Sequence, residues 1–332
     1  MNVIDIKENS GVPKYKQIVG SIEKSIENGA VKKGDRLPSI NSIRNKFDLS
    51  RDTVLLAFNE LKIKGIVQSV AGKGYFVKND SVSGLKRVFL LFDELNNFKE
   101  DLYNAFLAHL GKDIQVDIYF HHFNHELFDR LVEASVGEYS AYVIMPANLR
   151  NIELSLSKLP AEQVFILDQT HAGLAKYPAI FQNFKKDIFN TLSSAYGQIK
   201  KYDNISLVYD PNKQPQGMAL GFEAFCKTHR MKNEVLFTIP ERKLVPGELF
   251  LVPGDRDLIA LIKKIRNQHL QIGKHIGIIS YNDTPLKEIV AEGITTISTD
   301  FKGMGIKLAQ MILGQEKKHI ENDCSIILRN SL

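Results

Sequence analysis

From about residue 88 to the C-terminus, short apolar runs alternate with amphipathic segments, and this alternation restricts the fold more than any other feature. Strands of a parallel sheet are covered on both faces and are therefore apolar throughout, with helices as the usual crossovers. Nine such runs are more than one open sheet usually holds, so we expect an α/β fold with two parallel-sheet lobes. The candidate strands are 88–92, 116–120, 141–145, 164–167, 205–209, 235–238, 249–252, 276–279 and 294–297, and the candidate helices are 101–110, 127–135, 188–199, 219–229 and 258–266.

The first 77 residues have a different pattern. Apolar side chains at helical spacing predict three helices: the first closes at Asn28, Ser39 opens the second and Ser50 caps the third. Two short strands, 66–70 and 75–77, follow around a glycine-rich tip. The segment therefore has the order of a winged helix-turn-helix.

All of the excess positive charge lies in this N-terminal segment. The whole chain has a net charge of +5; residues 1–80 hold 14 basic and 9 acidic residues, and the remainder holds 29 of each. A basic module on a neutral body favours a polyanion such as nucleic acid as its partner. The alternative is that these charges lie on an ordinary solvent-exposed face that binds no partner.

The third predicted helix begins with the residues that would read DNA. In helix-turn-helix modules the N-terminus of the second helix of the pair reaches base edges in the major groove. Arg51 can pair with guanine or phosphate, and the hydroxyls of Ser50 and Thr53 suit phosphate or base contacts. Lys73, between Gly72 and Gly74, puts one cation on a tip with little bulk. A winged helix used for protein contacts is the alternative.

Four motifs in this segment resemble the GntR-family winged helix. They are VPKYKQI at 12–18, KGDRLPS at 33–39, LSRDTV at 49–54 and GKGYFV at 72–77. The resemblance implies DNA contacts by Arg36, Ser39, Arg51, Thr53, Gly72 and Lys73. Asn41 and Leu55 stand where many relatives carry arginines, so operator preference cannot be transferred from those relatives.

Polar residues cluster where the candidate strands end. In parallel α/β lobes ligands bind at the carboxyl ends of the strands, and carboxylates and amides there suit the hydroxyls of a polyhydroxylated ligand. Phe98, Tyr281 or Phe301 would supply an apolar face. The alternative for some of these polar residues is a role in turns or helix caps, which Asp and Asn favour. The candidates are Asp93, Asn96, Asn97, Asn148, Asp168, Gln169, Asp255, Arg256, Asn282 and Asp283.

The C-terminal part resembles the LacI-type effector domain. The matching stretches are IGIISYNDTPL at 276–286, ITTI at 294–297 and Met304-Gly305, preceded by LVPGD at 251–255 and Gly221-Phe222. The resemblance implies a periplasmic-binding-protein fold, with two lobes joined by three crossovers and a small-molecule site in the cleft. Met218 stands where relatives carry an arginine that grips the effector, which favours a neutral sugar, with Gln216 or another residue filling that role.

We place a DNA-binding domain at 1–78, a linker at 79–87 and an effector-binding domain at 88–332. Lobe 1 would take about 88–184 and 300–318, and lobe 2 about 185–299 and 319–332. The expected function is a cytoplasmic, dimeric transcription regulator, a repressor rather than an activator, whose operator binding responds to a monosaccharide. From the resemblance the sugar would be a pentose or deoxyhexose such as arabinose or fucose. The alternative is an enzyme or sugar-binding protein with a winged-helix appendage.

Other classes of protein lack support in the sequence. Nucleophile-elbow, phosphate-loop, dinucleotide-binding and zinc-protease motifs are absent, so we expect neither an enzyme nor a cofactor. The run from His121 to His125 lacks metal-ligand spacing, and Asn124 or His125 would cap the following helix. Cys226 and Cys324 are too few for a disulfide framework. No apolar stretch is long enough for a transmembrane helix or a signal peptide.

Overall fold

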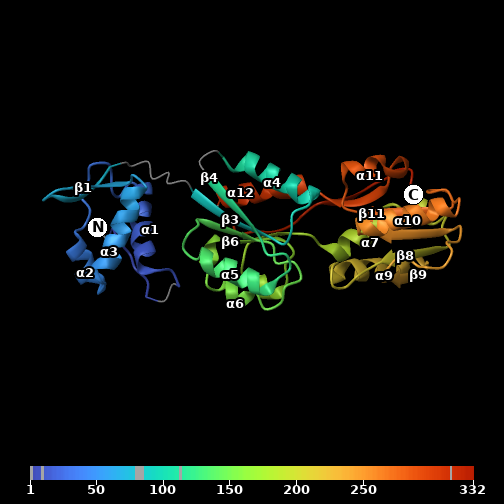
Figure 1. Cartoon of the computed structure of the whole chain (residues 1–332), viewed down its shortest axis with the longest axis horizontal. Coiled ribbons are helices and arrows are strands. Elements are labelled where there is room, and N and C mark those ends of the chain that lie inside the picture. The colour runs from blue at the N-terminus through green and yellow to red at the C-terminus, as the bar shows by residue number, and fades with distance from the viewer. Residues whose placement is uncertain (1–2, 9–10, 79–85, 112–113, 315) are drawn as a thin grey trace. The chain divides into compact units, whose positions relative to one another are not determined.

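A computed structural model describes residues 3–8, 11–78, 86–111, 114–314 and 316–332 (Figure 1). These form two compact units. The first comprises Met1–Asp93, Gly111–Ile144 and Leu149–Phe165, and the second comprises Glu94–Leu110, Met145–Asn148 and Ile166–Leu332.

The first unit begins with the predicted winged helix-turn-helix. Ser39 and Ser50 cap the second and third helices by accepting hydrogen bonds from the backbone N–H groups of Ser42 and Thr53. The helices enclose a small apolar core in which Phe58 is fully buried. The elements are α1 (Lys14–Glu27), α2 (Ile40–Phe47), α3 (Arg51–Ile63) and the antiparallel wing strands β1 (Val67–Val70) and β2 (Gly74–Val77).

The remaining strands form two six-stranded sheets. The first has the order β13-β7-β6-β5-β3-β4, and its paired strands are parallel: β3 with β4 and β5, and β7 with β6 and β13. Its strands are β3 (Lys86–Phe92), β4 (Ile114–Phe120), β5 (Ala141–Ile144), β6 (Val164–Asp168), β7 (Ala179–Phe181) and β13 (His319–Glu321).

Helices accompany this sheet in both units. In the second unit α4 and α12 lie side by side (Figure 1), and Gly305 allows the contact: a Cβ there would lie 2.3 Å from the carbonyl oxygen of Leu102. The helices are α4 (Asn97–Leu110), α5 (His125–Ser135), α6 (Glu153–Leu156), η1 (Ala161–Gln163), η2 (Ala172–Leu174) and α12 (Phe301–Leu313).

The second sheet has the order β14-β12-β11-β10-β8-β9 and lies in the second unit. It is parallel except for β14, which runs antiparallel to β12. Its strands are β8 (Asn204–Val208), β9 (Lys232–Leu236), β10 (Glu248–Val252), β11 (Ile276–Tyr281), β12 (Thr295–Thr299) and β14 (Cys324–Ile327), with the helices α7 (Phe184–Ser194), α8 (Tyr196–Ile199), α9 (Gln216–His229), α10 (Asp255–Asn267), α11 (Pro285–Ile289) and η3 (Val290–Glu292).

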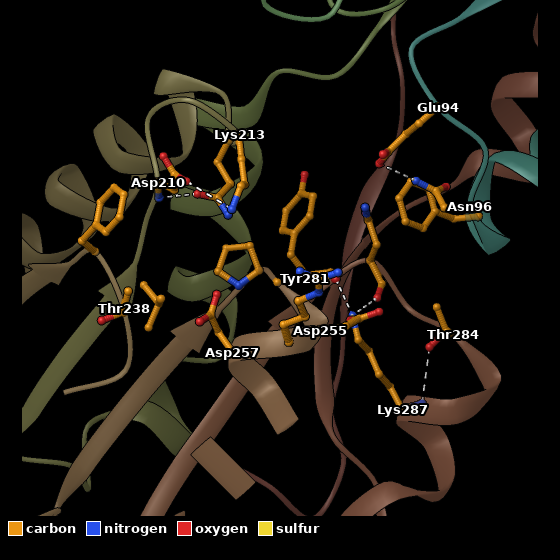
Figure 2. A pocket seen from close by; sticks show the side chains of 18 residues that line it. Glu94, Asn96, Asp210, Lys213, Thr238, Asp255, Asp257, Tyr281, Thr284 and Lys287 are labelled. Carbon is orange, nitrogen blue, oxygen red and sulfur yellow. Dashed lines mark hydrogen bonds and ion pairs between the residues drawn. The ribbon is translucent and has the colours of Figure 1, made fainter. Parts of the chain in front are cut away.

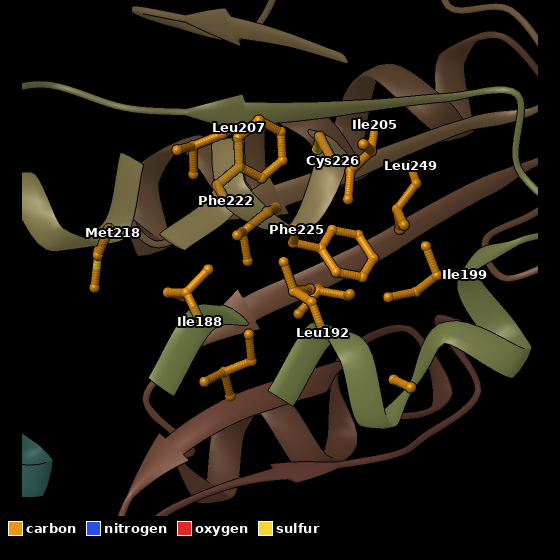
Figure 3. Packing of buried hydrophobic residues seen from close by; sticks show 14 of the residues in the cluster. Ile188, Leu192, Ile199, Ile205, Leu207, Met218, Phe222, Phe225, Cys226 and Leu249 are labelled. Atoms are coloured by element: carbon orange, nitrogen blue, oxygen red, sulfur yellow. The ribbon is translucent and has the colours of Figure 1, made fainter. Parts of the chain in front are cut away.

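Both faces of this second sheet are covered. Leu249 and Leu251 of β10 join the apolar cluster of α7 and α9 (Figure 3), whereas Phe250 and Val252 join the cluster of α10. Successive side chains of a strand point to opposite faces, so burial on both sides requires the unbroken apolar run seen in the sequence. The two-lobed α/β prediction is confirmed.

Some boundaries differ from the prediction. β7, β13 and β14 were missed because runs of three or four residues with polar members give little apolar signal. β13 pairs with β7, so residues 319–321 belong to the first sheet and not to lobe 2. β3 begins at Lys86, so residues 86 and 87 belong to this strand and not to the predicted linker 79–87. Residues 79–85 lie outside the described residues. The described residues include no helix long and apolar enough to cross a membrane.

Close packing of α7 on α9 yields a stability prediction. A Cβ at Gly221 would lie 2.5 Å from the carbonyl oxygen of Lys185, which is backbone and cannot rotate away. Gly221→Ala should therefore destabilise the protein by about 1–3 kcal/mol in urea unfolding. Gly197→Ala is the control, because a Cβ there would meet no atom within 4 Å other than its own stretch of helix. Equal unfolding midpoints for the two variants would contradict this packing.

A buried carboxylate in α7 yields a pH prediction. Asp187 is 7% exposed, and its Oδ2 has no hydrogen-bond partner among the described residues. Burial, and then the nearby carboxylate of Glu321, raise the pKa of Asp187 from 3.8 to about 6. Because the folded state disfavours the charged form, stability is lost as the pH rises from about 4 through 6.

Asp187→Asn should remove this loss. The variant should be more stable than the wild type at pH 8, by roughly 1–2 kcal/mol after allowance for screening, and the gain should shrink towards pH 4.5. Urea unfolding at pH 4.5, 6 and 8 measures it. The more exposed Asp101→Asn is the control, and a gain for Asp187→Asn that does not vary with pH would refute the assignment.

Candidate functional site

The N-terminal domain exposes most of the residues predicted to contact DNA. Arg51, the first residue of α3, is exposed, as are Arg36, Ser39, Ser50, Gly72 and Lys73, while Thr53 is half-buried. Ser39 and Ser50 also cap helices, and the Ser50 and Thr53 hydroxyls lie 2.8 Å apart. Ser50 and Thr53, two of the predicted DNA contacts, therefore also stabilise the N-terminus of α3.

Arg36 lies at the base of the wing. Its backbone pairs with Phe76 of β2, and its guanidinium lies 3.6 Å from the position that a Cβ at Gly74 would occupy. Gly72 and Gly74 have φ of +73° and +104°, a region that favours glycine, so the tight tip depends on both. The wing and the start of α3 thus each carry an exposed cation.

A cavity of about 540 Å³ lies in the second unit, at the carboxyl ends of β8, β10 and β11 (Figure 2). Six of the residues that the sequence offered as ligand contacts line it: Asn96, Phe98, Asp255, Arg256, Tyr281 and Asn282. The complete lining is Glu94, Asn96, Phe98, Val208, Asp210, Lys213, Gln214, Phe237, Thr238, Pro253, Gly254, Asp255, Arg256, Asp257, Tyr281, Asn282, Thr284 and Lys287.

The wall of the cavity combines acceptors with aromatic rings. Carboxylates outnumber cations, and two of the cations are paired: Lys213 with Asp210 at 3.4 Å, and Lys287 with Asp255 at 3.0 Å. The hydrogen bond from the backbone N–H of Asn212 helps to hold the pKa of Asp210 below its usual value. Phe98, Phe237 and Tyr281 supply the apolar surface.

The other candidates, Gln169 and Asp283 among them, lie outside this lining. Asn97, Asn148 and Gln216 are exposed, and Asp93 is buried at the end of β3. Phe301 is buried and supports Phe98, with 4.7 Å between the ring centroids. Asp168 is buried and accepts a hydrogen bond from Gln182.

Two further sequence interpretations change in the structure. Asp283, considered as a ligand-binding carboxylate, instead accepts two hydrogen bonds from the guanidinium of Arg329, at 2.7 and 2.8 Å. Met218 is buried in the apolar cluster of α7 and α9 (Figure 3). The position where relatives carry an effector-gripping arginine is therefore part of the core.

Gln182 joins strand ends of the two sheets within the second unit. Its side-chain oxygen accepts hydrogen bonds from the hydroxyls of Tyr281, at 3.1 Å, and Thr299, at 2.5 Å, and its amide donates to Asp168. Burial raises the pKa of Tyr281 well above 10, so the phenol stays a donor. Because the side chain of Tyr281 also lines the cavity, the network connects the cavity wall to the ends of β6 and β7.

In the run from His121 to His125, Asn124 and His125 make structural contacts. Asn124 caps α5 by accepting a hydrogen bond from the backbone N–H of Leu127. The sequence predicted that either Asn124 or His125 would be this cap. Nε2 of His125 lies 2.7 Å from the carbonyl oxygen of Arg150, and Nδ1 lies 3.0 Å from Asp129. Within the described part of the chain, no group of three or more His, Cys, Asp or Glu residues could hold a metal ion.

Sequence reasoning missed several lining residues. Lys213, Phe237 and Lys287 carry no strand-end signal of their own: Phe237 follows an edge strand, and Lys287 lies in a five-residue helix. The LacI-like motif ends at Leu286, directly before Lys287, so proximity to that motif was the available signal.

Comparisons with known proteins agree with this architecture. Residues 14–77 match the family model described as bacterial regulatory proteins, gntR family, and residues 200–331 match the periplasmic binding protein-like domain. The chain is 35% identical over 81 residues to the uncharacterized HTH-type transcriptional regulator YdfD of Bacillus subtilis, covering 24% of this chain and only 17% of that protein.

Another curated relative is matched over nearly the whole of both chains. The arabinose metabolism transcriptional repressor of Geobacillus stearothermophilus is 22% identical, with 97% of this chain and 96% of that protein covered. Among solved structures, a LacI family transcriptional regulator from Enterococcus faecalis V583 with bound ribose superposes with a TM-score of 0.60 at 17% identity, covering 74% of this chain and 98% of that one, which shows a shared fold. The chain therefore joins an N-terminal GntR-type helix-turn-helix domain to a C-terminal periplasmic-binding-protein-like domain with the fold of LacI-type effector domains.

Proposed function

We propose that this protein is a cytoplasmic transcription regulator, a repressor, whose operator binding responds to a monosaccharide held in the cavity of the second unit. One observation carries the proposal: the chain that exposes Arg51 at the start of a capped recognition helix also holds an acceptor-rich cavity at the strand ends of its periplasmic-binding-protein-like domain. A regulator needs both parts.

The proposed DNA contacts follow from exposure and charge. Arg51 would reach a base edge or phosphate from the N-terminus of α3, with Arg36 and Lys73 on the backbone beside the wing. Ser39, Ser50, Thr53 and Gly72 would approach the same backbone. The protein would act as a homodimer on a two-fold operator, since each winged helix reads one half-site.

The proposed ligand is neutral and polyhydroxylated. Lys213 is paired with Asp210 and Lys287 with Asp255, so two of the three lining cations are already neutralised by carboxylates. The lining has four carboxylates against three cations, which disfavours an anionic ligand, and carboxylate oxygens accept hydrogen bonds from hydroxyl groups. Phe98 and Phe237 offer apolar surface to the C–H face of a sugar ring. A pentose or deoxyhexose such as arabinose or fucose fits this set, and the arabinose repressor and the ribose-bound regulator among the relatives support the pentose class.

Replacing Arg51 tests the DNA-binding part. With the full-length protein and DNA from the region upstream of its own gene, Arg51→Ala should weaken binding about 10- to 100-fold in a fluorescence anisotropy titration. The exposed Arg130→Ala on α5 is the control and should bind as the wild type does. Wild-type binding that is insensitive to salt, or equal binding by both variants, would count against this interface.

A thermal-shift screen with L-arabinose, L-fucose, D-xylose and D-ribose tests the ligand site. A sugar that binds should stabilise the wild type by about 2.7 kcal/mol at a hundred times its Kd. Asn282→Gly should reduce this effect, because it removes a lining amide while tolerating the φ of +58° at that position. Asn148→Gly alters an exposed residue outside the lining and should leave the shift unchanged. Stabilisation by none of the four sugars would reject the proposed ligand class.

A further inference from the structure

Lys287 is a buried cation in the cavity wall, only 5% exposed. Its ammonium donates to the carbonyl oxygens of Tyr281, at 2.7 Å, and Asn282, at 2.8 Å, and lies 3.0 Å from Oδ1 of Asp255. An ammonium has three N–H donors, so these three partners account for all of them. Lys287 therefore has no donor left for a ligand.

The carbonyls that Lys287 binds belong to a turn with an unusual backbone. Asn282 has a φ of +58°, and this residue turns the chain as it leaves β11. Thr284 then caps α11 by accepting a hydrogen bond from the backbone N–H of Lys287. Lys287 thus contacts this turn through its backbone and its side chain, and both contacts restrain residues 281–284.

The third partner lies on another element. Asp255, labelled in Figure 2, is the first residue of α10. Its side chain is 68% exposed. Without a partner, such a side chain on the surface samples several rotamers. The ion pair with Lys287 holds one carboxylate oxygen, and the geometry leaves the other oxygen available to the cavity that Asp255 lines.

Burying a lysine has an energetic cost that the contacts must offset. Burial lowers the pKa of Lys287 below 10.5, and Asp255 acts in the opposite direction. A residue that served only packing would be apolar here, because an uncharged side chain avoids the desolvation penalty. The arrangement therefore indicates a role for the charge in placing its partners.

We propose that Lys287 is a positioning residue for the ligand site: it fixes the Asp255 carboxylate and the turn at Asn282 as hydrogen-bond acceptors for the hydroxyl groups of a sugar. This proposal rests on the proposed function, because it takes the cavity as the sugar site. Lys287 acts through its neighbours and does not contact the ligand.

Hydrogen exchange of the full-length protein without ligand tests the positioning itself. Lys287→Met, similar in length but uncharged, should speed amide exchange in 281–287, where the N–H groups of Asn282, Asp283 and Lys287 are hydrogen-bonded. Lys287→Arg keeps donors and should restore part of the protection. Lys263→Met, an exposed position on α10, is the control. Wild-type exchange in Lys287→Met would overturn the proposal.

Affinity then tests the consequence for the ligand. For any sugar of the panel that stabilises the wild type, calorimetry should show at least a tenfold loss for Lys287→Met and a smaller loss for Lys287→Arg. Because Lys287 acts partly through Asp255, Lys287→Met combined with Asp255→Asn should bind more tightly than the product of the two single losses predicts. Independent, multiplicative losses, or a Lys287→Met variant with wild-type affinity, would overturn the proposal.

The two proposals fail in different ways. If none of the four sugars binds the wild type, the proposed function fails, whereas the exchange experiment still decides the role of Lys287. If Lys287→Met does not fold, as its melting curve would show, Lys287→Gln, which is also uncharged, replaces it in both experiments. Wild-type exchange in 281–287 for that variant would then overturn the proposal.

Discussion

Burial of the parallel strands on both faces is the constraint on which the rest of the C-terminal part depends. Every residue of β10 and β11 is buried, and apart from Glu248, Ser280 and Tyr281 these strands are apolar. Most of the polar side chains that line the cavity therefore lie on the loops that leave the strands. Asp255 and Asn282 follow β10 and β11, and Asp210 follows β8, so the cavity forms where these loops meet.

Local signals predicted the N-terminal domain well. Ser39 and Ser50 are caps whose effect extends only three residues, and both cap the helices expected from the sequence. Apolar runs likewise predicted the long strands, because an unbroken apolar run is stable only where both faces of the strand are buried, as in a parallel sheet covered by helices. β13 was assigned to the wrong lobe, since His319-Ile320-Glu321 has no run and its pairing with β7 is set by tertiary structure.

The candidate ligand site was less predictable, for a physical reason. Asp168 and Asp283 look like free carboxylates in the sequence, yet each is used by a partner distant in the chain, Gln182 and Arg329 respectively. Lys287 is the reverse case: a lysine in a short helix reads as a surface residue, and only the fold buries it against Asp255. A side chain's type marks it as a candidate, but its partners decide whether it is available to a ligand.

Regulation requires that ligand and operator each change the affinity of the protein for the other. The bonds of Tyr281 to Gln182, and of Gln182 to Asp168, give the cavity wall a direct connection to strands of the first sheet. The most direct test is to measure the Kd of the operator with and without the sugar, and the Kd of the sugar with and without the operator. Linkage predicts the same factor in both, typically 5- to 150-fold. A sugar that binds in the cavity and leaves the operator Kd unchanged would contradict the account.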